Sequence, residues 1–210
     1  MNFDDYFINP EKLYKYIEEK LSSHQHTVYK YADVRYRHAA VLIPLFFKNG
    51  EVHLLFTKRT DKVETHKGQI SFPGGMADKS DDKLRETALR ETWEEMGIKS
   101  SDIKLLGKTD KFLTNTNFMV TPYVGHFPYP YEFKISEDEI ERVIEVPLSQ
   151  LIKPEIFEIK PWVRDGIKWN IHYYNYNGDV IWGVTGFLLS NFFQIVFEIN
   201  RFKSSLIFSE

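Results

Sequence analysis

Apolar and polar positions in the first part of the chain follow two patterns, one typical of helices and one of buried strands. Residues 10–21 have apolar side chains at helical spacing directly after Asn9-Pro10, a combination that suits a helix start. Residues 39–47 form an unbroken apolar run, which predicts a buried strand. Asn49-Gly50 predicts a hairpin turn into a partner strand at residues 52–57.

Strand and helix patterns continue to alternate along the rest of the chain. A short strand at 69–72 is expected before a helix at 82–96, and the later elements are a strand pair at 103–112 and 118–127, a short helix at 147–152, strands at 156–159 and 169–176, and a last helix at about 182–202. No internal repeat or low-complexity segment interrupts this order. The pattern therefore predicts a single α/β domain over residues 1–210.

Composition supports a globular domain and excludes several functions. The 210 residues are 42% hydrophobic and 27% charged, and the net charge of −3 gives no sign of nucleic-acid or anionic-membrane binding. The absence of cysteine excludes disulfides, thiolate catalysis and cysteine zinc sites. The N-terminus does not resemble a signal peptide, and no apolar run approaches the roughly 20 residues of a membrane helix. We therefore expect a cytoplasmic protein.

The strongest candidates for chemistry are three glutamates on the predicted helix at 82–96. Glu91, Glu94 and Glu95 stand at i, i+3 and i+4, so on a helix they share one face. Like charges so close repel one another unless a cation lies between them, and carboxylate oxygens suit Mg²⁺ or Mn²⁺. Gly74 and Gly75 precede the helix and let the backbone approach a ligand closely. The stretch predicts a metal platform for hydrolysis of a phosphate anhydride; the plain alternative is a solvated acidic helix end.

Residues 74–98 resemble the Nudix box, G-x5-E-x7-R-E-U-x-E-E-x-G-U, where U is aliphatic. The matching residues are Arg90-Glu91, Glu94-Glu95, Gly97 and Ile98. The sequence departs from the pattern at three points: Thr92 takes the first aliphatic position, the gap from Gly75 to Arg90 is one residue longer, and either Asp81 or Asp82 replaces the upstream glutamate.

Residues 54–75 are similar to the segment that marks coenzyme A pyrophosphatases, a Nudix subfamily that carries the same one-residue extension. The subfamily pattern L-L-T-x-R-[SA]-x3-R-x3-G-x3-F-P-G-G is nearly met, with matches that include Thr57, Arg59, Gly68 and the Phe72–Gly75 run. Glu64 stands where the pattern has arginine and so reverses a charge. This change bears on the substrate more than on the fold.

The resemblance implies a Nudix α/β/α sandwich, with a mixed sheet between helices. It also implies metal-dependent cleavage of coenzyme A or its thioesters to adenosine 3′,5′-bisphosphate and 4′-phosphopantetheine or an acyl derivative. Glu91 and Glu95 would be the primary ligands of Mg²⁺ or Mn²⁺, together with Glu94 and the Gly75 carbonyl. The expected partner is a small nucleotide rather than a nucleic acid or a membrane, and the protein is expected to be a monomer or a homodimer.

Four further residues receive roles through the same resemblance. Arg90 would pair with a carboxylate of the box, and Arg59 would meet the substrate beside Gly74 and Gly75. Glu139 precedes Val146-Pro147-Leu148 at the subfamily's spacing and would orient or deprotonate the attacking water, with Glu141 as the fallback.

Other functions remain open at this stage. The protein could instead act on ADP-ribose or another dinucleotide, because Glu64 replaces the arginine of the coenzyme A pattern. It could also be a catalytically inactive Nudix module that senses a nucleotide, or a purely structural acidic domain. Separately, His24 and His26 are spaced to chelate a metal, but no third ligand lies near them in the sequence, so a polar loop is expected there.

Overall fold

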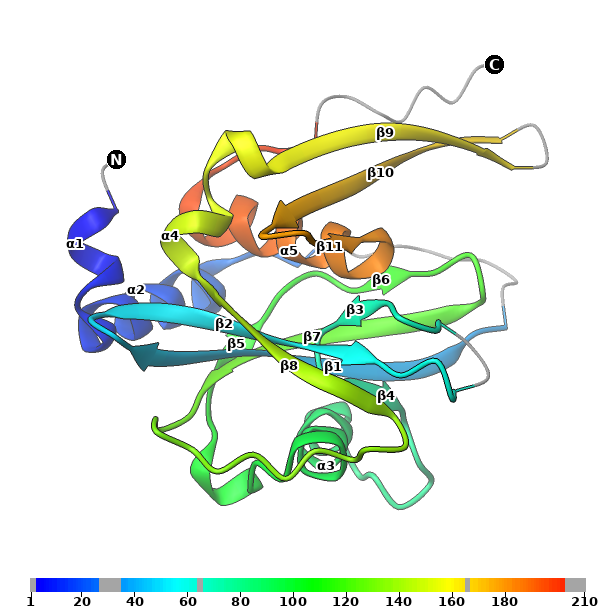
Figure 1. Ribbon diagram of the computed structural model, residues 1–210, viewed down its shortest axis with the longest axis horizontal. Coiled ribbons are helices and arrows are strands. Elements are labelled where there is room, and N and C mark those ends of the chain that lie inside the picture. Colours follow the sequence, from blue (N-terminus) through cyan, green and yellow to red (C-terminus); the bar gives the residue numbers. More distant parts are fainter. Residues whose placement is uncertain (1–2, 27–34, 64–65, 165–166, 203–210) are drawn as a thin grey trace.

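The structure is a computed structural model that describes residues 3–26, 35–63, 66–164 and 167–202 (Figure 1). Within these residues, the main sheet has eight strands in the order β3-β2-β1-β7-β5, with β4 and β6 paired to β1 and β7, and β8 paired to β2. The bounds are β1 Arg37–Lys48, β2 Glu51–Arg59, β3 Ile70–Ser71, β4 Gly74–Met76, β5 Lys104–Lys108, β6 Phe112–Leu113, β7 Phe118–His126 and β8 Ile140–Pro147. The sheet is mixed, because β1 runs parallel to β7 and antiparallel to β2.

Helices cover both faces of this sheet. Helix α3 (Leu84–Met96) lies on one face, and α5 (Gly183–Phe197) lies on the other (Figure 1). Helices α1 (Asp4–Phe7) and α2 (Pro10–Ser23) join the core on the α5 side. The expected α/β/α sandwich is confirmed.

A second, three-stranded sheet lies outside α5, in the order β11-β10-β9 (Figure 1). Its strands and the short helices near it are β9 Phe157–Arg164, β10 Ile167–Tyr176, β11 Asp179–Trp182, α4 Leu148–Leu151 and the 3₁₀ turn Pro154–Ile156; another 3₁₀ turn, Ser100–Asp102, follows α3. None of the helices in the described ranges combines the length and apolar character needed to cross a membrane.

Two buried clusters explain the unbroken apolar run of β1. Ile43 and Leu45 point into the larger cluster, on the α5 side, whereas Leu42 and Phe46 point into the smaller one, on the α3 side. Side chains of a strand alternate between the two faces of its sheet, and both faces of β1 are covered. An alternating pattern was therefore not to be expected in this strand.

The hairpin turns follow the sequence prediction closely. Asn49 and Gly50 have φ of 51° and 87°, and Asn177 and Gly178 have φ of 51° and 88°. Both dipeptides thus occupy the left-handed region that a tight hairpin of this kind requires. The predicted turn at Asn49-Gly50 is confirmed, and Asn177-Gly178 forms a second turn of the same kind between β10 and β11.

Several predicted boundaries were wrong. The last helix ends at Phe197 rather than near 202, because Glu198 is left-handed (φ 59°) and Arg201 turns back to donate to carbonyls after α4. Helix α3 begins at Leu84 rather than 82, and the predicted strand at 103–112 is divided into β5 and β6. No strand was predicted at 140–147, where the structure has β8. Likewise, no strand was predicted at 74–76, where the structure has β4.

Candidate active site

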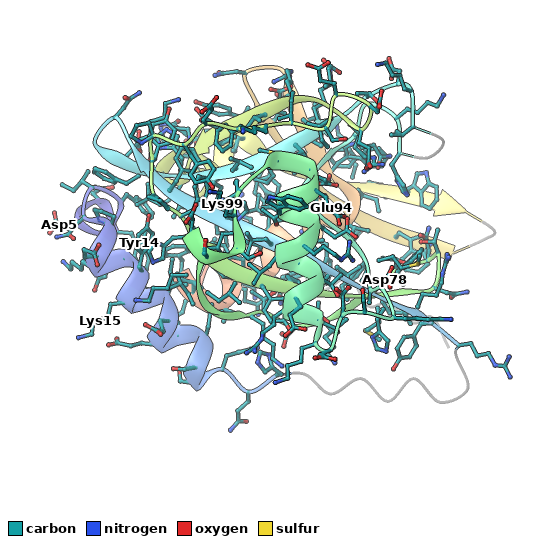
Figure 2. All side chains as sticks on the ribbon, turned by 90° about the horizontal axis from the view of Figure 1, so that it is seen from below. Asp5, Tyr14, Lys15, Asp78, Glu94 and Lys99 are labelled. Carbon is teal, nitrogen blue, oxygen red and sulfur yellow. The ribbon has the colours of Figure 1, made fainter. Side chains whose placement is uncertain are left out.

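Helix α3 presents its glutamates to very different surroundings. The Glu95 side chain is 5% exposed, that of Glu91 18% and that of Glu94 47%. Figure 2 looks onto α3, with Glu94 on the helix and Asp78 in the preceding loop. Thr92 is buried, and its hydroxyl donates to the Ala88 carbonyl at 2.7 Å, so the polar residue at the usually aliphatic position has an acceptor within the helix.

Strand β4 brings the glycines against these carboxylates. It pairs with β1 in a register that sets Gly75 opposite Ala40. A Cβ atom on Gly75 would lie 2.5 Å from the Glu91 carboxyl carbon. Gly74 has φ of 154°, and a Cβ there would lie 2.4 Å from the Ala40 carbonyl oxygen. Gly74 therefore needs glycine for both space and backbone conformation, whereas a side chain at Gly75 would displace the Glu91 carboxylate.

Arg90 connects the carboxylates at the outer side of the helix. Its Nη1 donates to Glu91 Oε1 and to Glu94 Oε2, each at 2.9 Å. Its Nε and Nη2 donate to the two oxygens of Asp81 at 3.2 and 3.0 Å. The sequence expectation that Arg90 pairs with the carboxylates of the box is matched by this geometry.

Asp81, rather than Asp82, is the aspartate that contacts Arg90. Its carboxylate also accepts hydrogen bonds from the Thr87 hydroxyl and the Asp78 backbone N–H, both at 2.9 Å. The Arg90 guanidinium lowers the pKa of Asp81 to about 2, so this carboxylate is ionised at neutral pH. The sequence left open whether Asp81 or Asp82 replaces the upstream glutamate of the box, and the contact with Arg90 indicates Asp81.

Arg59 lies between two acidic residues from separate parts of the chain. Its Nη1 is 3.8 Å from Glu95 Oε1, and its Nη2 is 3.9 Å from Glu139 Oε2. These distances allow ion pairing but are too long for hydrogen bonds. The β2–β8 register shifts between Lys58 and Arg59, and such irregularities often stand next to active sites. Glu141, the fallback for Glu139, instead accepts a hydrogen bond from Lys58 at 3.0 Å.

Burial makes the inner carboxylates hard to ionise. Desolvation raises the pKa of Glu95 to about 8; Arg59 opposes this rise, and the charges of Glu91 and Glu139 add to it. Desolvation also raises the pKa of Glu91, against the hydrogen bond from Arg90. Each carboxylate would ionise more readily if a positive charge lay beside it.

The donor set fits a hard divalent cation. Glu95 Oε2 is buried and has no hydrogen-bond partner among the described residues, and the same is true of Arg59 Nε. An unpaired buried carboxylate oxygen is costly, and a cation beside it removes that cost. Glu91 and Glu95, one helical turn apart, and the backbone of Gly75 offer the oxygen ligands that Mg²⁺ and Mn²⁺ prefer.

The structure thus brings most predicted site residues together. Five of them converge between α3 and the sheet: Glu91, Glu95, Gly74, Gly75 and Arg59. Glu139 reaches the same region from the loop before β8, and Glu94 and Arg90 lie at its outer edge. Glu64, where the sequence reverses a charge, lies outside the described residues.

Residues 36–169 match the NUDIX domain family, and the chain belongs to this family of hydrolases. It is 34% identical over 190 residues to "Uncharacterized Nudix hydrolase NudL" of Yersinia pestis (strain Pestoides F), which covers 90% of this chain and 93% of that protein. A NudL of Yersinia enterocolitica is 36% identical over 159 residues, 76% of this chain and 81% of that protein. The names of these relatives give no substrate.

Solved structures with a similar arrangement include the binary complex of a C. elegans Ap4A hydrolase. It is 19% identical, with a TM-score of 0.46 over 53% of this chain and 80% of that one. The NUDIX domain of Shewanella oneidensis NrtR, complexed with ADP ribose, is 17% identical, with a TM-score of 0.43 over 62% and 82% of the two chains.

Proposed function

We propose that this Nudix hydrolase cleaves the diphosphate of coenzyme A or its thioesters. The products would be adenosine 3′,5′-bisphosphate and 4′-phosphopantetheine or its acyl derivative. The observation that carries hydrolysis is the pair of buried Glu95 and partly buried Glu91, the latter against the Gly75 backbone, with one oxygen of Glu95 lacking a hydrogen-bond partner among the described residues. The substrate rests on the resemblance of residues 54–75 to the coenzyme A pyrophosphatase segment.

Glu91, Glu95 and the Gly75 carbonyl would hold Mg²⁺ or Mn²⁺, with Glu94 as an outer ligand. A bound divalent ion would acidify a water molecule and neutralise charge on the phosphates. Arg90 would keep Glu91 and Glu94 at a fixed spacing through its two hydrogen bonds.

Glu139 is the proposed general base. Its side chain is 52% exposed and lies within ion-pair distance of Arg59, which itself lies within ion-pair distance of Glu95. An accessible carboxylate beside the inner pair can accept a proton from an attacking water. Glu141 is less suited to this role because Lys58 engages its carboxylate. Arg59 would add positive charge facing the phosphates.

A second candidate substrate is ADP-ribose or another dinucleotide. The sequence observation in its favour is Glu64, which replaces an arginine of the coenzyme A pattern. The same carboxylates would carry out the hydrolysis, because the reaction at the diphosphate is the same. A nucleotide-sensing module without catalysis is disfavoured, since all three glutamates of the box are present.

A hydrolysis screen tests the proposal. Coenzyme A, acetyl-coenzyme A, dephospho-coenzyme A, ADP-ribose and NADH are each incubated with the protein and either Mg²⁺ or Mn²⁺. Preferential release of adenosine 3′,5′-bisphosphate from coenzyme A is expected. Preference for ADP-ribose or NADH would replace the substrate but keep the chemistry. Absence of cleavage by the folded protein, with nucleotide binding retained, would favour the sensing module.

A further inference from the structure

A second group of potential metal ligands lies away from the glutamates. His24 and His26 follow the end of α2, and Asp110 lies in the connection between β5 and β6. One ligand atom from each of the three residues lies within 4.8 Å of the other two. Sequence reasoning did not find this third ligand, because Asp110 is 86 residues from His24 along the chain and only the fold brings the two side chains together.

The distances within this His–Asp cluster suit coordination. His24 Nε2 is 3.0 Å and His26 Nδ1 is 3.5 Å from the same oxygen, Asp110 Oδ1. In a tetrahedral site with bonds of 2.0–2.1 Å, ligand atoms are separated by about 3.3 Å. The two observed distances lie on either side of that value, so small side-chain rotations would be enough to admit an ion.

A buried residue of α5 makes two hydrogen bonds to Asp110. Asn191 is 9% exposed; its Oδ1 accepts a hydrogen bond from the Asp110 backbone N–H at 3.2 Å, and its Nδ2 donates to Asp110 Oδ2 at 3.4 Å. These contacts leave Oδ1 directed at the two imidazoles. An amide that orients a carboxylate in this way is the arrangement that supports metal ligands elsewhere.

The cluster is accessible and separate from the glutamates. The side chains of His24, His26 and Asp110 are 23%, 35% and 12% exposed, so an ion can enter and water can complete its coordination. Asn191 belongs to α5, which lies on the face of the main sheet opposite α3 (Figure 1). The Nudix carboxylates lie on the α3 side.

We propose that His24, His26 and Asp110 form a binding site for a divalent transition-metal ion of the Zn²⁺ type. Two imidazoles and one carboxylate favour Zn²⁺ and its neighbours over Mg²⁺, which prefers oxygen ligands alone. A bound ion would connect the end of α2 to the β5–β6 connection and, through Asn191, to α5. The alternative is a metal-free contact, in which the imidazoles only hydrogen-bond or pair with Asp110.

Zn²⁺ titration by calorimetry in excess Mg²⁺ separates these two cases. Excess Mg²⁺ would compete for the oxygen-rich glutamate site, so the Zn²⁺ binding that a histidine variant removes reports on the imidazole ligands. The wild type is compared with His26→Gln, and with His38→Gln as a matched control, because His38 is an exposed histidine outside the cluster. We expect one Zn²⁺ per wild-type chain, at least about 100-fold weaker binding in His26→Gln, and wild-type binding in His38→Gln.

A second readout does not depend on the variant's folding. In wild-type protein labelled with ¹⁵N at histidine, one equivalent of Zn²⁺ in excess Mg²⁺ should shift the ring signals of His24 and His26. Zn²⁺ should also raise the Tm of the wild type but not of His26→Gln. Unshifted His24 and His26 signals, or equal Zn²⁺ affinity in wild type and a folded His26→Gln, would overturn the proposal. Because no readout is enzymatic, the result is independent of the proposed hydrolysis.

Discussion

Arg90 and Asp81 form a two-pronged ion pair, with the guanidinium Nε and Nη2 donating to separate carboxylate oxygens at 3.2 and 3.0 Å. The Asp81 side chain is 6% exposed. This pair ties the loop before α3 to the middle of the helix. It also orients the guanidinium whose third nitrogen, Nη1, holds Glu91 and Glu94.

Asp81→Asn should destabilise the protein by about 2–3 kcal/mol at neutral pH, because charged hydrogen bonds to Arg90 are lost in a nearly buried place. Denaturant unfolding at pH 7 measures this change. Asp82→Asn, at the exposed neighbouring position, should stay within about 0.5 kcal/mol of the wild type. Equal stability of the two variants would contradict the structural role of Asp81.

The same carboxylate predicts a loss of stability in acid. Its pKa is lowered to about 2 in the folded protein, below its usual value of 3.8. The stabilisation is therefore fully present above pH 3.8 and is lost as the pH falls towards 2. The wild-type advantage over Asp81→Asn should shrink across that interval, and an advantage that stays constant down to pH 2 would contradict the assignment.

Glu95→Gln should reduce turnover by at least about 100-fold, the scale for losing a principal charge-stabilising group, with little change in shape. Steady-state hydrolysis of the best substrate at saturating Mg²⁺ measures it. Glu137→Gln, an exposed glutamate outside the carboxylate group, is the control and should keep wild-type turnover. Wild-type-like turnover in Glu95→Gln would refute the metal platform.

Metal-free stability should depend on pH through Glu95. Burial raises its pKa to about 8 from 4.5, so the folded protein favours the protonated form, and stability contributed by this group is lost as the pH rises from 4.5 through 8. In chelator, the Tm of the wild type should fall relative to Glu95→Gln between about pH 5 and 9. At the alkaline end of this range, Mg²⁺ should restore the Tm of the wild type. Parallel Tm curves for the two proteins would argue against this account.

Gly75→Ala should weaken metal binding more than folding. The added Cβ would meet the end of the Glu91 side chain, which can move aside, at 2.5 Å. Displacing that carboxylate should raise the Mg²⁺ concentration for half-maximal activity about 10- to 100-fold. Two measurements distinguish weakened metal binding from unfolding: the dependence of activity on Mg²⁺ concentration and the Tm without metal. Unchanged Mg²⁺ dependence of activity would show that Glu91 is not a ligand.

Glu139→Gln should lower kcat by about 100-fold or more with a smaller change in KM, as expected for loss of a general base. Glu141→Gln, measured in parallel, distinguishes the two candidates. A large kcat loss in Glu141→Gln alone would transfer the role to Glu141.

Local features of this protein were predictable from sequence. The i, i+3, i+4 spacing of Glu91, Glu94 and Glu95 follows from helix geometry alone, and the Asn-Gly turns follow from the conformations those residues accept. The family was indicated separately, by the resemblance of residues 74–98 to the Nudix box. The local rules did not reveal β4, since a glycine-rich stretch carries no strand pattern, and its pairing to β1 depends on a partner far away in the chain.

Tertiary structure decided the features that depend on distant segments. Burial of Glu95 against the sheet raises its pKa to about 8, whereas its helical neighbour Glu94 remains half exposed. Sheet register brings Arg59 towards Glu139, and packing of α5 turns Asp110 towards His24. Spacing along a helix is determined by covalent geometry, but desolvation and long-range contacts arise only when the sheet and its covering helices assemble.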